Sequence, residues 1–72
     1  MTKDDAVTRA RAFAEQQGWT WREPIHTESH RSWLSGAKRW QVVSNYGVLG
    51  GNVRVEIDDA SGEIVSANFL PR

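Results

Sequence analysis

Apolar residues near the amino terminus recur at spacings of three and four, which is typical of one face of an α-helix. Thr2 followed by Asp5 resembles a capping box, and acidic side chains in a first turn are favoured by the positive end of the helix dipole. Gly18 supplies a residue suited to a left-handed stop. The pattern predicts a helix over residues 3–17. Its apolar positions are Ala6, Val7, Ala10, Phe13 and Ala14.

After this glycine the apolar period changes from that of a helix to that of a strand. Trp19 and Trp21 alternate with polar residues as far as Pro24, and a proline limits such a segment to an edge strand or a short extended piece. We therefore predict a first strand over residues 19–23. Polar and small residues dominate the next stretch and predict a long loop over residues 24–38.

Alternating apolar and polar residues predict three further strands, over residues 39–46, 52–58 and 63–69. The middle one is the clearest, because Val53, Val55 and Ile57 alternate strictly with charged residues. In the last one, Val65 should share the face of Ala67 and Phe69, with Ile64 on the opposite face.

Strands that follow one another through short connections pair as an antiparallel meander, and a single amphipathic helix then covers one face of the sheet. We predict one α+β domain spanning residues 1–72, with the N-terminal helix packed on a three- to four-stranded antiparallel sheet. The first strand would leave a free pairing edge, so the chain is expected to be a monomer or an edge-paired homodimer.

Composition narrows the possible functions. The chain has no cysteine, which excludes disulfides and thiolate ligands, and its nine basic and nine acidic residues cancel. A neutral, interspersed charge pattern does not favour nucleic acid or a membrane surface as a partner. No signal peptide or apolar run of about 20 residues is present. We expect a cytoplasmic protein without a cofactor.

Two segments resemble ion sites at first sight. In DDASGE, residues 58–63, the ligand spacing of an EF-hand is not met, and the aspartates with Gly62 predict an ordinary hairpin turn. His26, Glu28 and His30 would share one face of an extended strand and could then converge on a metal ion. A fourth ligand is lacking nearby, so exposed histidines are the favoured interpretation and no metal site is predicted.

The chemistry of the remaining residues favours binding over catalysis. No Gly-x-Ser-x-Gly elbow or phosphate-binding glycine loop occurs, so we do not expect an enzyme. Trp19, Trp21 and Trp40 are expected in the core because a small domain needs their area. The stretch between them combines aromatic and basic residues, as interface hot spots do. The predicted partner-binding residues are His30, Arg31, Trp33 and Leu34.

Non-catalytic protein binding has two alternatives. The tryptophans could serve as stacking platforms for single-stranded nucleic acid beside Arg22, Arg31, Lys38 and Arg39. The chain could also be a small structural domain without a dedicated partner.

The two ends of the chain resemble PepSY-type domains, the modules named for peptidase propeptides. These have an N-terminal helix with a Thr-x-x-x-Ala start, matched by Thr2 and Ala6, and strands ending in a V-x-V-D-x-x-x-G-x-V hairpin. The hairpin pattern is matched by Val55, Ile57, Asp58, Gly62, Ile64 and Val65. The resemblance covers about half of the chain and implies an α+β module that binds or restrains a partner protein, commonly a peptidase. A similar architecture occurs among small immunity proteins that neutralise a toxin.

Overall fold

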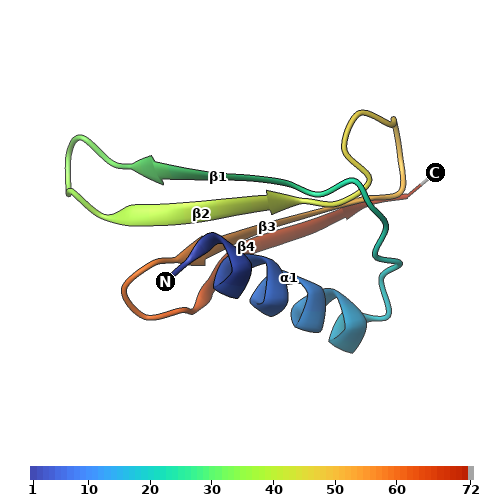
Figure 1. Cartoon of the computed structure of the whole chain (residues 1–72), viewed down its shortest axis with the longest axis horizontal. Helices are drawn as coiled ribbons and strands as arrows, with labels where there is room; N and C mark the ends of the chain where they lie inside the picture. Colours follow the sequence, from blue (N-terminus) through green and yellow to red (C-terminus); the bar gives the residue numbers. More distant parts are fainter. Residues whose placement is uncertain (72) are drawn as a thin grey trace.

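The computed structural model describes residues 1–71 as one helix and one antiparallel sheet (Figure 1). The elements are α1 (Lys3–Gln17), β1 (His26–Arg31), β2 (Lys38–Val43), β3 (Asn52–Asp58) and β4 (Ile64–Leu70). The strands lie in the sheet in chain order, β1-β2-β3-β4, and α1 packs against β1, β2 and β3. The α+β fold with an antiparallel meander is therefore confirmed.

The predicted helix begins and ends where its capping residues place it. The Thr2 hydroxyl accepts a bond from the Asp5 backbone N–H and the Asp5 carboxylate accepts one from the Thr2 N–H, each at 3.1 Å. Both bonds of the capping box are thus made. At the other end Gly18 adopts the left-handed conformation, with φ of 75°, and the chain leaves the helix there.

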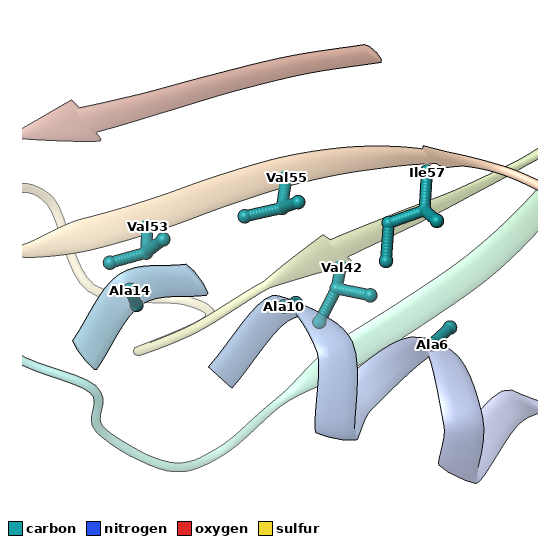
Figure 2. Close-up of a cluster of buried hydrophobic side chains, with 7 residues drawn as sticks. All are labelled: Ala6, Ala10, Ala14, Val42, Val53, Val55 and Ile57. Carbon is teal, nitrogen blue, oxygen red and sulfur yellow. The ribbon is translucent and has the colours of Figure 1, made fainter. Parts of the chain in front are cut away.

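The core lies between α1 and the centre of the sheet (Figure 2). The helix contributes only alanines to its fully buried positions, so no large side chain separates the helix from the strands there. The facing strands contribute β-branched residues, which pack well on a pleated surface. The fully buried apolar residues are Ala6, Ala10, Ala14, Val42, Val53, Val55 and Ile57.

The predicted first strand over residues 19–23 is wrong. This segment is an irregular connection from α1 to β1, in which Trp19 and Trp21 are half-buried against the core. The Trp19 ring lies 5.8 Å from that of Phe13, edge to face, and 5.8 Å from that of Phe69, stacked. The alternation of tryptophan with polar residues therefore reflects packing of aromatic rings on the core and not strand pairing.

The predicted long loop over residues 24–38 is also wrong, because β1 lies inside it. Each residue of β1 pairs with β2, from His26 opposite Val43 to Arg31 opposite Lys38. β1 is an outer strand whose last four residues are exposed, so it carries no apolar alternation that would identify it in the sequence. The actual loop is limited to residues 32–37.

The end of β2 and the register of β4 differ from the prediction, and the difference in β4 changes which side chains are buried. β2 ends at Val43, three residues earlier than predicted, because Ser44 turns its hydroxyl to accept the Val53 backbone N–H at 2.9 Å. In β4 the register shifts between Ser66 and Ile64, and Val65 has no partner on β3. Ile64 consequently packs on the core while Val65 is 44% exposed, the reverse of the expected arrangement.

Candidate functional site

The hairpin tip is the loop over residues 32–37 that joins β1 to β2 (Figure 1). Of the predicted binding residues, Trp33 and Leu34 lie in this loop, and His30 and Arg31 are the last two residues of β1 before it. The loop is closed by backbone bonds from Ser32 N–H to the Ala37 carbonyl, at 2.8 Å, and from Gly36 N–H to the Ser32 carbonyl, at 2.7 Å. The Arg31 guanidinium donates to the Gly36 carbonyl at 2.7 Å and braces the loop from the side. These bonds give the tip a defined shape.

Trp33 and Leu34 are the large apolar side chains of this tip. They are 89% and 78% exposed, whereas the other tryptophans of the chain all pack against the core. Exposure of a whole indole ring leaves a large apolar surface in water. The sequence left open whether Trp33 is buried or exposed; the structure exposes it, and its neighbour Leu34 enlarges the same apolar surface.

A shallow depression of about 280 Å³ lies beside the tip. His30, Arg39 and Glu56 contribute to it from three neighbouring strands, and Arg39 lies opposite both His30 and Asp58 in the register. The Arg39 guanidinium is 4.0 Å from the Glu56 carboxylate. The full lining is His30, Arg31, Ser32, Ser35, Ala37, Arg39 and Glu56. The structure thus brings His30 and Arg31 together with Arg39 and Glu56, which gives the depression charges of both signs.

His26, Glu28 and His30 occupy alternate positions of β1, as the extended alternative requires. The Nε2 atom of His26 is 3.0 Å from one Glu28 carboxylate oxygen, and that of His30 is 3.8 Å from the other. The carboxylate therefore lies between the two imidazoles and is within hydrogen-bond distance of His26. Within residues 1–71, no group of three histidine or acidic side chains has an arrangement that could hold a metal ion.

The DDASGE segment forms the predicted hairpin turn between β3 and β4. The Asp58 carboxylate accepts hydrogen bonds from the Ser61 backbone N–H at 2.9 Å and from the Ser61 hydroxyl at 2.8 Å. The Ser61 N–H, followed by the hydroxyl, holds the pKa of Asp58 below its usual value. Gly62 closes the turn with a φ of 74°. The acidic residues therefore cap a turn.

A second apolar tip at the opposite end of the sheet was not predicted. It lies between β2 and β3, where Val48 is 42% exposed and Leu49 is 98% exposed. Tyr46 stands at its base, and its ring stacks on that of His26 at 4.4 Å. The only signal in the sequence is the pair of apolar residues inside the glycine-rich stretch GVLGG, residues 47–51.

Comparison with protein-family models, with curated proteins and with solved structures finds no match for this chain. α1, the one helix of residues 1–71, is too short and too polar to cross a membrane.

Proposed function

We propose that this chain is a non-catalytic protein-binding module that contacts its partner through the hairpin tip. The observation that carries the proposal is the exposure of Trp33. Its side chain is 89% exposed in a hydrogen-bonded loop, whereas the other tryptophans pack against the core. Tryptophan is the residue type most enriched among interface hot spots, and a rigid loop loses little entropy when it is bound.

The chemistry around the tip defines the partner surface that would fit it. Trp33 and Leu34 need an apolar pocket, and the charges of both signs beside them, Arg31, Arg39 and Glu56, favour a pocket surrounded by complementary polar groups. A narrow, projecting hairpin inserts into a concave site more readily than it covers a flat one. This geometry supports the role of an inhibitor or immunity-like protein that restrains a peptidase or a toxin, in keeping with the resemblance to PepSY-type domains.

The arrangement of the aromatic residues favours protein over single-stranded nucleic acid as the partner. A stacking platform needs several exposed rings along one groove. Trp19 and Trp21, which would complete such a platform, are half-buried against the core, and Trp33 stands alone at the tip. The basic residues beside Trp33 are also offset by Glu28 and Glu56.

The experiment compares the two apolar tips of the sheet. Tagged wild-type protein, W33A/L34A and the matched control V48A/L49A would be used to capture proteins from an extract of the source cells. Both double variants remove exposed side chains, so each should change the free energy of unfolding by no more than about 0.5 kcal/mol per substitution. Arg31 is kept because its guanidinium braces the loop.

The proposal expects one captured protein that V48A/L49A retains and W33A/L34A loses, with a rise in its dissociation constant of at least about a hundredfold for two hot-spot side chains. Retention of every captured protein by W33A/L34A would show that the hairpin tip is not the binding surface. Equal loss with both variants would instead indicate non-specific adhesion of exposed apolar residues.

A further inference from the structure

β4 forms one free edge of the sheet (Figure 1). The Leu70 carbonyl accepts the Gly51 backbone N–H at 2.6 Å, so the backbone of Leu70 faces β3. The N–H and C=O of one strand residue point to the same side, and successive residues alternate. Ala67 and Phe69 therefore direct their backbone groups away from β3, and no backbone group within residues 1–71 pairs with them there.

The two outer strands of the sheet differ sharply in charge. β1 carries His26, Glu28, His30 and Arg31, and charged side chains are a common means of preventing an edge strand from pairing with another chain. β4 has seven residues, IVSANFL, and none of them is charged. The structure therefore protects one edge of the sheet and leaves the other able to pair.

We propose that β4 pairs with β4 of a second copy, antiparallel and with the two-fold axis at Ala67, to give a continuous eight-stranded sheet. In this register Ala67 lies opposite itself and, because its backbone groups point outward, the pair exchanges two hydrogen bonds. On either side, Ser66 lies opposite Asn68 of the second copy. The methyl group of Ala67 leaves room at the axis.

A second copy fits this edge because the register is symmetric and pairs side chains of similar character. Ala67 meets Ala67, and the exposed Ser66 and Asn68 form a polar pair on each side of it. Such an interface is isologous and closes after two copies, so it forms a dimer and not a fibre. The proposal is independent of the hairpin tip and of the protein that the tip binds.

The test uses two double variants, S66K/N68K and S66E/N68E. Ser66 lies opposite Glu56 on β3, and Asn68 lies opposite Arg54. Each variant therefore creates one favourable and one unfavourable charge pair within its own chain, and thermal melts should show similar stabilities. Across the proposed two-fold axis, by contrast, each variant places like charges opposite one another.

A small interface associates weakly, so sedimentation equilibrium would cover concentrations from about 10 µM to about 1 mM. The wild-type protein should form a reversible dimer, and each double variant should weaken it by at least about tenfold, because two like-charge pairs oppose association. An equal mixture of the two variants should dimerise again, since opposite charges then meet. W33A/L34A should dimerise like the wild type.

A wild-type protein that remains monomeric over this range would overturn the proposal. The same holds if either double variant dimerises as tightly as the wild type. Loss of the dimer in W33A/L34A, with no effect of the charge variants, would place the contact at the hairpin tip and would also exclude pairing through β4.

Discussion

Replacing Ala10 by leucine (A10L) should cost this chain a large part of its stability. Ala10 is fully buried at the middle of α1, where it faces the valines of the sheet (Figure 2). An isobutyl group has no space between the helix and the strands, so either α1 moves away from the sheet or neighbouring side chains leave their rotamers. Overpacking of this kind costs about 1–3 kcal/mol, and we expect about 3 kcal/mol because the helix contributes only alanines to this layer.

That loss is large for a small domain. At about 0.05–0.15 kcal/mol per residue, a chain of 72 residues has a free energy of unfolding of about 4–11 kcal/mol. With an m-value of about 1 kcal/mol/M in urea, the midpoint of unfolding should fall by about 3 M. Equilibrium urea denaturation followed by far-ultraviolet circular dichroism would measure this shift.

The matched control is A12L, the same substitution two residues further along the same helix. Ala12 is exposed, and leucine is nearly as good a helix former as alanine, so A12L should change the free energy of unfolding by no more than about 0.5 kcal/mol. If A10L is no more destabilising than A12L, the close contact between α1 and the sheet does not exist and the described core is wrong.

Two further predictions concern polar groups. The Thr27 hydroxyl oxygen is buried without a hydrogen-bond partner among residues 1–71, so T27V should raise the free energy of unfolding by about 1 kcal/mol in urea denaturation; a decrease would show that the hydroxyl has a partner. Hydrogen bonds from backbone N–H groups and an indole lower the pKa of three carboxylates below 3.8, those of Asp5, Asp58 and Asp59. Because these pKa values are lower in the folded state, the stability they contribute is complete only above about pH 5 and is lost progressively as the pH falls further. The urea midpoint should therefore be lower at pH 2.5 than at pH 6, and an equal midpoint would contradict the argument.

The elements that the sequence predicts correctly are those with local signals. Thr2 and Gly18 determine the ends of α1 through contacts within a few residues, and Asp58 and Gly62 determine the turn before β4 in the same way. β3 is one of the two inner strands, and it is predicted because its apolar and polar residues alternate more regularly than those of any other strand. In each case the pattern that indicates the element lies within a few neighbouring residues.

The errors arise where the conformation depends on distant residues. β1 forms because β2 supplies its hydrogen-bond partners, and its own polar residues contain no strand pattern. Trp19 is held by rings of α1 and β4, so its spacing from Trp21 is irrelevant to pairing. The exposure of Val65 follows from a register shift against β3, which no property of β4 alone would predict.

The candidate site likewise has one part that the sequence indicates and one part that it does not. Trp33 and Leu34 are candidate binding residues in the sequence because they are apolar within a polar segment, and their exposure is known only from the structure. The depression beside them could not be predicted, since His30, Arg39 and Glu56 are far apart in the chain and meet only through the pairing of β1, β2 and β3.

The positions of the two proposed surfaces allow both to act together. The hairpin tip joins β1 to β2, whereas the proposed dimer forms along β4, at the other side of the sheet. In the eight-stranded sheet β1 of each copy would be an outer strand, and seven strand spacings of about 4.8 Å place the two outer strands about 34 Å apart. Each tip would remain accessible, so the dimer presents two copies of Trp33 and Leu34 to one partner oligomer or to two partners. Association through β4 would then raise the apparent affinity for a multivalent target without any change at the tip itself.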